Sequence, residues 1–285
     1  MVKGKALSIP MSFYCRGAHC ASVVSGKSQN VPLICYLLAC QTPVPLTRWR
    51  YYEAFRRIFT KLRANHPGLV LQNCASGGGR LDWGTMSLFH NAELSDWMRL
   101  PRGMRSLGGV SMSLPPEILL RTFGTEMGDM MCDGDLDAQL RGCLICRPIF
   151  RGIAPDAASL NPYLIQTVTR HVDLFKRFIR PLMENCLVYH HTPFQPVLAP
   201  AELTVLEYAA ANRSAGLIAA FSGTEDGAGG HVIYPAGVER GARYRVTFGN
   251  TGESIELGGF ELRSNGIRIV LAQAQCSELV MFEKL

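Results

Sequence analysis

A glycine-rich segment from Cys74 to Asp82 is the first candidate for a ligand-binding loop; its sequence is Cys-Ala-Ser-Gly-Gly-Gly-Arg-Leu-Asp. The three glycines follow a short apolar run, and a chain without Cβ atoms can turn sharply and approach a ligand closely. At the C-terminal end of a barrel strand, such a turn faces the active site. For the glycines alone, a tight turn without a ligand is the simpler interpretation. The segment lacks the Gly-Lys-Ser/Thr ending of a phosphate-binding loop, which excludes that function.

A second candidate is the carboxyl group of Asp96, in the segment Ser95-Asp96-Trp97. A carboxylic acid at a strand end beside an aromatic ring can be partly desolvated, so that it keeps a proton for delivery to a leaving oxygen. Considered alone, Asp96 is explained more simply as a helix cap. It lies one strand-helix step after the glycine-rich segment, and the two segments together are more specific than either alone.

The elements that position these segments are predicted to alternate between helix and strand. Thr47 is a suitable cap for a helix that ends near His66. The predicted buried face of this helix consists of Trp49, Tyr52, Phe55, Ile58, Phe59 and Leu62. Predicted strands are Leu69–Asn73, Phe89–Leu94, Leu107–Ser113 and Gly142–Ile149, and predicted helices are Ile118–Met131 and a long one opened by Asn161-Pro162. This alternation predicts βαβ units and a parallel sheet.

After about Pro196, the pattern changes to short strands separated by turn signals such as Asp226-Gly227 and Asn265-Gly266. The predicted strands are Leu203–Tyr208, Gly216–Phe221, Val232–Tyr234, Arg243–Phe248, Ser254–Leu257, Gly266–Leu271 and Glu278–Phe282. Many short strands at this spacing predict a small antiparallel β-sandwich.

Three motifs together resemble glycoside hydrolase family 36, whose members are retaining α-galactosidases and α-N-acetylgalactosaminidases. The motifs are Cys-x-Ser-Gly-Gly-Gly-Arg-x-Asp at 74–82, Leu-Ser-Asp at 94–96 and Gly-x-Ser-x-x-Leu-Pro-Pro-Glu at 109–117. The resemblance extends from about Thr47 to the end of the chain, through Arg177–Leu182, Tyr244-Arg245-Val246 and Ser277-Glu278-Leu279.

The resemblance implies an α/β fold with two folded regions. Residues 46–195 are expected to form the C-terminal half of a (β/α)8 TIM-type barrel, and residues 196–285 an antiparallel β-sandwich domain. Residues 1–45 have no persistent helical or strand period and stay unassigned.

The resemblance also implies roles for individual residues. Asp96 matches the general acid/base that protonates the glycosidic oxygen and later activates water. Cys74 and Gly77 match positions that line the galactose subsite. Arg80 and Asp82 match motif positions that are expected to be structural and paired with each other. Trp97 departs from the family, which usually has a small polar residue there; its indole is expected to shape the leaving-group side or to stack on a sugar.

One catalytic group of the family has no counterpart. Retaining glycosidases use two carboxylates about 5 Å apart, one as nucleophile and one as acid/base. In the relatives, the nucleophile is an Asp on the barrel strand before the helix that corresponds to the one opened by Thr47. Residues 26–45 contain neither Asp nor Glu. The first four barrel strands and the N-terminal β-domain of the relatives also have no counterpart.

These observations lead to hypotheses from different classes. In the first, the chain belongs to a retaining α-galactosidase that hydrolyses terminal α-linked galactose, with Asp96 as acid/base and a nucleophile that this sequence does not encode. In the second, the chain is catalytically inactive and binds carbohydrate or a partner through the retained sugar subsite. A third interpretation is a fragment that does not fold stably.

Composition and charge limit the partners. A hydrophobic fraction of 47% and a charged fraction of 18% are ordinary for a globular protein. Residues 1–81 hold eleven Lys or Arg and one acid, whereas the remainder holds eighteen bases and twenty-two acids. Nucleic acid is not expected as a partner, because the basic surplus lies in the unassigned segment and on one helix face. The expected ligand is an α-galactoside or oligosaccharide, and a homo-oligomer is left open.

No cofactor and no metal are expected, because two carboxylates do this chemistry unaided. Cys143 and Cys146 have zinc-ligand spacing but lack a second pair, so structural thiols are the preferred interpretation. The Asp133-x-Asp135-x-Asp137 segment lacks the Gly and Glu of a calcium loop. The run Val31–Cys40 is too short to span a bilayer. The compartment is left open, with the cytoplasm slightly favoured over secretion.

Overall fold

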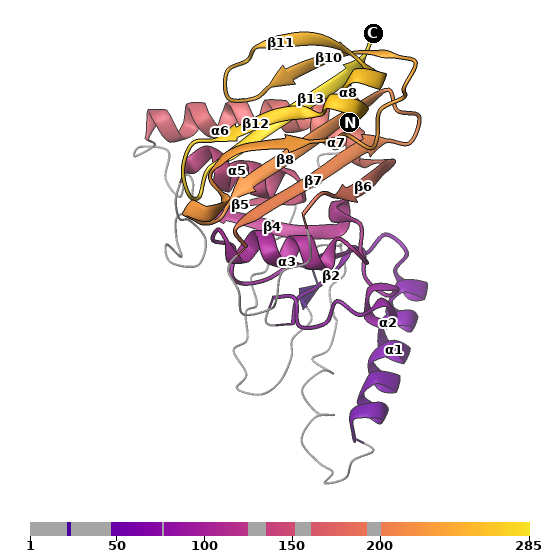
Figure 1. Ribbon diagram of the computed structural model, residues 1–285. Helices are drawn as coiled ribbons and strands as arrows, with labels where there is room; N and C mark the ends of the chain where they lie inside the picture. The colour runs from indigo at the N-terminus through magenta and orange to yellow at the C-terminus, as the bar shows by residue number, and fades with distance from the viewer. Residues whose placement is uncertain (1–21, 24–46, 76, 125–134, 152–160, 193–200) are drawn as a thin grey trace, which may run out of the picture. The chain divides into compact units, whose positions relative to one another are not determined.

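The computed structural model describes residues 22–23, 47–75, 77–124, 135–151, 161–192 and 201–285 (Figure 1). The chain divides into two compact units, Met1–Glu93 and Leu94–Leu285. The predicted domain boundaries after residues 45 and 195 fall outside the described residues, as does most of the unassigned segment 1–45. Each unit is described by itself.

The first unit combines a long helix with short strands. Its elements are β1 (Ser22–Val23), α1 (Thr47–Asn65), β2 (Leu71–Asn73), α2 (Trp83–Met86) and β3 (Asn91–Glu93). Strand β2 pairs with β1 in the antiparallel sense and with β3 in the parallel sense. The helix predicted from Thr47 and the strands predicted at Leu69–Asn73 and Phe89–Leu94 are therefore confirmed, although both strands are shorter than expected.

The buried face of α1 differs from the predicted one at its N-terminal end. Trp49 is 69% exposed and donates from Nε1 to Glu53 at 2.8 Å, and Tyr52 is also exposed. The side chains that pack instead are spaced by four, four and three residues, as expected for one helix face. The resulting cluster consists of Tyr51, Phe55, Phe59 and Leu62 of α1 with Leu69, Leu71, Leu88 and Phe89.

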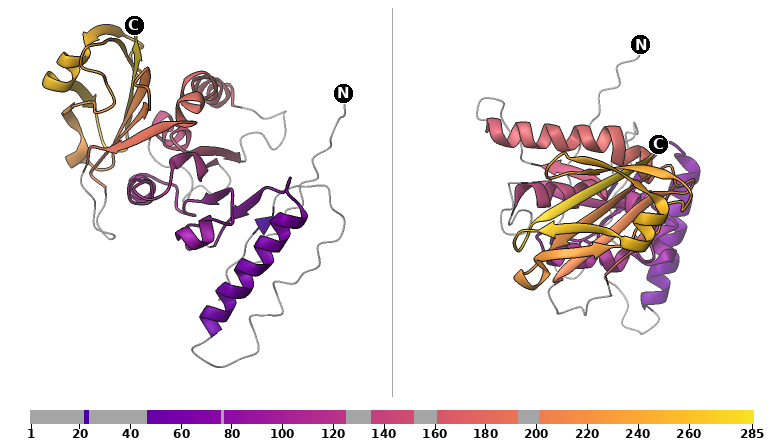
Figure 2. Two further views of the ribbon diagram at one scale, coloured as in Figure 1. Left: turned by 90° about the vertical axis from the view of Figure 1, so that its right-hand side faces the viewer. Right: turned by 45° about the horizontal axis from the view of Figure 1, so that its top comes forward.

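The second unit begins with alternating helices and strands. Its elements up to residue 183 are α3 (Arg102–Val110), a 3-10 turn (Pro116–Ile118), β4 (Leu119–Gly124), α5 (Leu136–Leu144), β5 (Arg147–Arg151), α6 (Pro162–Leu174), a π-helical turn (Phe175–Ile179) and α7 (Arg180–Met183). Strands β4 and β5 are parallel, with Leu120 opposite Arg147. Helix α5 packs on both strands and against α6 (Figure 2).

Two segments of this region are assigned wrongly from the sequence. Leu107–Ser113 is not a strand, because Arg102–Val110 forms α3, with Met104 and Leu107 on its buried face. The predicted helix Ile118–Met131 begins instead as strand β4, which is buried on both faces. A short apolar run of this kind fits a buried strand and a helix equally well. The strand predicted at Gly142–Ile149 begins only at Arg147, since α5 continues to Leu144.

The long helix opened by Asn161-Pro162 is confirmed. The Asn161 side chain accepts from the backbone N–H groups of Tyr163 and Leu164, and Pro162 occupies the first helical position. The helix widens into the π-helical turn immediately before Pro181. Proline has no N–H to donate, which favours such a local change in the hydrogen-bond ladder.

The rest of the second unit consists of two antiparallel sheets. The larger sheet has the strand order β11-β10-β13-β8-β7-β6, and the smaller one pairs β12 with β9. The strands are β6 (Cys186–His190), β7 (Leu203–Ala210), β8 (Ala215–Ser222), β9 (Gly229–Ile233), β10 (Arg243–Phe248), β11 (Ser254–Gly258), β12 (Ile267–Leu271) and β13 (Ser277–Lys284). All seven strands predicted after residue 196 are confirmed. The sequence analysis missed β6 and the short helix α8 (Gly259–Asn265).

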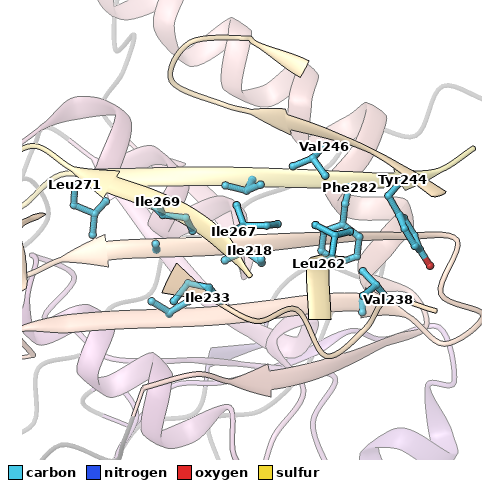
Figure 3. Packing of buried hydrophobic residues seen from close by; sticks show 14 residues of the cluster. Ile218, Ile233, Val238, Tyr244, Val246, Leu262, Ile267, Ile269, Leu271 and Phe282 are labelled. Carbon is cyan, nitrogen blue, oxygen red and sulfur yellow. The ribbon is translucent and has the colours of Figure 1, made fainter. Parts of the chain in front are cut away.

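The core of this region lies between the two sheets. Figure 3 shows apolar side chains from β8, β10 and β13 meeting those of β9, β12 and α8. Tyr244 and Phe282 contact edge to face, with ring centroids 6.0 Å apart. The fold is thus mixed α/β, with parallel and antiparallel strand pairs, as the sequence predicts. Among the helices that the structure describes, none combines the length and apolar character needed to cross a membrane.

Candidate functional site

The glycine-rich segment forms a tight turn directly after β2. Gly77 has a φ of 69°, a left-handed conformation that favours glycine. The N–H of Ala75 donates to Gly77 O at 3.1 Å, and the N–H of Gly79 donates to Ala75 O at 3.0 Å. A Cβ on Gly79 would overlap Ala75 O. The sharp turn predicted from the three glycines is therefore confirmed, with Cys74 half-buried and Gly77 buried at its start.

Arg80 and Asp82 do not form the expected pair. The Arg80 guanidinium is buried over the rings of Tyr51 and Phe55, with its central carbon 5.0 and 5.3 Å from their centroids. Asp82 caps α2 and accepts from Thr85 N at 2.8 Å and from Thr85 Oγ1 at 2.7 Å. Burial raises the pKa of Asp82, but these hydrogen bonds to the charged form outweigh burial and lower it. Both residues are structural, but through different contacts.

Asp96 lies in a short turn between β3 and α3. Its neighbours Leu94 and Met98 are buried, whereas the Asp96 side chain is exposed. The turn is closed by a hydrogen bond from Trp97 N to Ser95 Oγ at 3.0 Å. Asp96 is not a helix cap, because α3 begins at Arg102 after Pro101. The partial desolvation expected for Asp96 is not observed, and the described residues make no hydrogen bond or ion pair to its carboxyl group.

Trp97, which follows Asp96 in the sequence, is held by a cation–π contact with Arg102. Its half-buried indole ring lies under the guanidinium of Arg102, whose central carbon is 4.6 Å from the ring centroid. Such a contact restrains the ring and places N–H donors beside it. Arg102 is exposed at the start of α3. The sequence analysis missed it, and its only sequence signal is a cation five residues after Trp97.

The third motif lies beside β6. Ser111 Oγ is 2.9 Å from His190 Nε2, next to a small cavity of about 70 Å³. Burial, followed by the neighbouring His191, lowers the pKa of His190. His191 in turn contacts the buried carboxylate of Glu207 at 2.7 Å. Both histidines therefore make contacts that suit a structural role.

The candidate residues form two groups, each in one unit. Cys74 and Gly77 lie within one turn in the first unit, and Asp96 and Trp97 are adjacent in the second. A buried carboxylate that the sequence analysis missed is Glu93, which receives a hydrogen bond from Gln72 at 3.5 Å. Its signal in the sequence is an acid within the predicted strand Phe89–Leu94.

No metal site is evident in the described part of the chain, which contains no group of three or more potential ligands among His, Cys, Asp and Glu. Cys143 and Cys146 are buried, and burial raises the pKa of Cys146 to about 12. Asp135 caps α5, and Asp137 contacts Arg170 at 2.7 Å. Asp133 lies outside the described residues.

Comparison with known proteins gives one match in sequence and several in structure. No protein-family model matches the chain. A probable α-galactosidase C from Aspergillus terreus is 32% identical over 79 residues, which are 28% of this chain and 11% of that protein.

Solved structures resemble the chain over most of its length. The α-galactosidase from Lactobacillus brevis has a TM-score of 0.72 at 17% identity, and the match covers 86% of this chain and 33% of that one. A GH36 α-galactosidase from Geobacillus stearothermophilus in complex with raffinose has a TM-score of 0.71 at 18% identity and covers 87% and 33%. The chain thus spans about a third of the length of these structures. The resemblance predicted from the motifs is confirmed: over most of its length, the chain has the fold of the GH36 α-galactosidases.

Proposed function

We propose that the chain is part of a retaining α-galactosidase-type glycoside hydrolase that removes terminal α-linked galactose. The observation that carries the proposal is the exposed Asp96 carboxyl group on a short turn between buried residues, in a chain with this fold. The α-galactosidases among its relatives support the same reaction class.

Asp96 is proposed as the general acid/base. It would protonate the glycosidic oxygen as the bond to the leaving group breaks, and then take a proton from the water that attacks the galactosyl carbon. An exposed carboxyl group can reach a substrate, and the proton that it takes from water in the second step restores the acid for the next cycle.

Cys74 and Gly77 are proposed to line the galactose subsite. The left-handed conformation and missing Cβ of Gly77 let main-chain groups approach the sugar hydroxyls. Trp97 follows the acid directly in sequence, so we place its indole on the leaving-group side. Arg102 supports this role, because it holds the ring and adds hydrogen-bond donors that suit a sugar leaving group.

The finer architecture also belongs to this proposal. Strands β2, β3, β4 and β5 would be the C-terminal strands of a (β/α)8 barrel within residues 46–195. The two antiparallel sheets, apart from β6, would be a β-sandwich domain within residues 196–285. In such a barrel, the turn after the C-terminal end of each strand faces the active site. The turn after β2 carries Cys74 and Gly77, and the turn after β3 carries Asp96.

We propose that the nucleophile lies outside residues 26–45. These residues correspond to its usual place in the family, but they contain neither Asp nor Glu. A second polypeptide or another segment of the complete enzyme would supply it. The proposed substrate is an oligosaccharide with terminal α-galactose, and no cofactor is needed for two-carboxylate chemistry. Nucleic acid and membrane are not proposed as partners, and a homo-oligomer stays open.

The same absence of carboxylates between residues 26 and 45 favours a second candidate function. In that case, the chain is a non-catalytic module that binds carbohydrate or a protein partner through the subsite of Cys74 and Gly77. The chain would then bind galactose but would not hydrolyse a galactoside.

Hydrolysis of an alkyl α-galactoside by the complete enzyme, with its nucleophile present, separates the two functions. Turnover that is abolished in Asp96→Asn and retained in Asp173→Asn, a control at an exposed position on α6, supports the enzyme. No turnover, together with galactose binding in a calorimeter, supports the binding module. Absence of both turnover and binding at millimolar sugar contradicts both functions.

A further inference from the structure

Strand β4 holds the turn that carries Asp96 at both ends. On one side, the N–H of Leu94 donates to Leu120 O at 3.0 Å. On the other side, Nη2 of Arg121 donates to Met98 O at 2.7 Å. Leu120 and Arg121 are consecutive residues of β4, so two neighbouring positions of one buried strand fix a five-residue segment with Asp96 at its centre.

Arg121 is an unusual residue to find in this place. It is 0% exposed, and its Nε and Nη1 atoms are buried without a hydrogen-bond partner. Among the described residues, its guanidinium makes one hydrogen bond, to Met98 O. A buried cation with two unsatisfied donors costs several kcal/mol in general, whereas an apolar side chain of similar volume would fill the same space more cheaply. The hydrogen bond to the turn is the evident compensation.

Two glycines on different helices make room for this guanidinium. A Cβ on Gly103 of α3 would lie 2.7 Å from Nη2 and 2.9 Å from Nη1 of Arg121, closer than such atoms approach. A Cβ on Gly142 of α5 would lie 3.3 Å from Nη2. Two glycines that are distant in the sequence therefore accommodate one buried cation.

We infer that Arg121 is a positioning residue, which fixes the Asp96-Trp97 turn through the carbonyl of Met98. The inference deepens the proposed function and rests on it for the role of Asp96. A general acid must stay within hydrogen-bond reach of the oxygen that it protonates. An exposed aspartate on an unanchored turn would sample many positions, whereas the two bonds to β4 leave only the residues between Leu94 and Met98 free to adjust.

Whether Arg121 anchors the turn can be tested without measuring enzymatic turnover. The chain has three tryptophans, and the other two, Trp49 and Trp83, are exposed, so replacing both with Phe leaves Trp97 as a single fluorescent probe beside Asp96. Arg121→Met is made in this background. The matched control is Arg80→Met, since Arg80 is also buried with unsatisfied Nε and Nη1 atoms but lies in the first unit.

Arg121→Met is expected to make amide exchange in residues 95–100 at least about tenfold faster, because the lost bond involves a charged donor. Quenching of Trp97 by acrylamide should rise in parallel. Arg80→Met should lower stability but leave the amide exchange of the turn and the quenching of Trp97 unchanged. Arg121→Lys keeps the charge but loses the planar donor group, and it should give an intermediate effect. This milder variant also serves if Arg121→Met does not fold.

Unchanged exchange and quenching in a folded Arg121 variant, or the same change in Arg80→Met, would overturn the inference. In the active enzyme, kcat should fall more for an alkyl than for a nitrophenyl galactoside, because only the alkyl leaving group depends strongly on the acid. A purely structural role would lower both rates equally. If Asp96→Asn has no effect on hydrolysis while the turn loosens in Arg121→Met, the proposed function fails and the anchoring stands.

Discussion

Two aspartates from neighbouring motifs differ in what surrounds them. Asp82 is tied to the first turn of α2 by hydrogen bonds from Thr85, whereas Asp96 is exposed on its turn and receives none from the described residues. The first environment suits a structural cap, and the second leaves a carboxyl group available for a substrate. The residue type alone therefore does not show the role of an aspartate; the contacts of its side chain are needed as well.

Replacing Asp82 with Ala should lower the free energy of unfolding by about 1 kcal/mol at pH 7, the usual worth of a helix cap. The pKa of Asp82 is lowered below its ordinary value of 3.8. Its contribution is therefore fully present above pH 3.8 and is lost as the pH falls through the folded-state pKa. Urea denaturation at pH 7 and at acidic pH measures the difference. Equal losses at both values would contradict this assignment.

Replacing Trp97 with Ala should raise KM for an oligosaccharide with a sugar leaving group by about tenfold, the usual scale for a lost aromatic contact and its packing. For a small alkyl galactoside, which cannot reach a leaving-group subsite, KM should change little. Steady-state kinetics of the active enzyme with both substrates provide the measurement. Equal changes for both substrates would place Trp97 outside the leaving-group side.

At the scale of elements, regular periodic patterns are sufficient to predict helices and strands, whereas short apolar runs are not. The alternating strands after residue 196 and the helices that begin at Thr47 and Pro162 follow from periodicity and turn residues. Between residues 102 and 124, the predicted order of strand and helix is reversed. Periodicity alone does not distinguish a buried helix turn from a buried strand, and the glycines of α3 lower its apparent helix propensity.

In the candidate site, too, some features can be predicted from the sequence and others cannot. The glycine turn and the position of Asp96 at a strand end are local properties, so the sequence predicts them. The contacts of Arg80 with aromatic rings, of Arg102 with Trp97 and of Arg121 with Met98 join residues through tertiary packing. The patterns of a single sequence do not specify such contacts.

Gly108 provides a test of helix α3. A Cβ added at Gly108 would meet no atom within 4 Å, and the residue lies inside Arg102–Val110. Gly108→Ala should therefore stabilise the chain by up to about 1 kcal/mol, because Ala favours a helix over Gly. Thermal or urea denaturation measures the gain. A loss of stability would favour the strand predicted for this segment from the sequence.

At the scale of the second unit as a whole, Arg141 joins the helical part to the larger antiparallel sheet. From α5, its Nη1 donates to Ser277 O at 2.9 Å and to the side-chain oxygen of Asn250. Burial raises the pKa of the nearby Glu278, and Arg141 counteracts that rise. These contacts explain why residues on both sides belong to one compact unit.

Arg141→Met should lower the free energy of unfolding by about 2–3 kcal/mol at pH 7, because it removes charge-assisted hydrogen bonds between buried groups. Without the cation, the pKa of Glu278 should rise further. A raised carboxyl pKa favours the folded state at acidic pH and disfavours it as the pH rises through the folded-state value. The defect should therefore be smaller at pH 4 than at pH 7. Arg170→Met, which breaks an exposed pair, is the control and should cost less than about 1 kcal/mol.

The most direct test of the account is the effect of Asp96→Asn on kcat/KM for raffinose, an oligosaccharide with terminal galactose, measured beside the Asp173→Asn control. As a general acid, Asp96 should contribute about a hundredfold or more with this poor leaving group, so the variant should lose at least that factor while the control keeps its rate. Equal rates in the two variants would show that Asp96 is not the acid, and they would contradict the central claim.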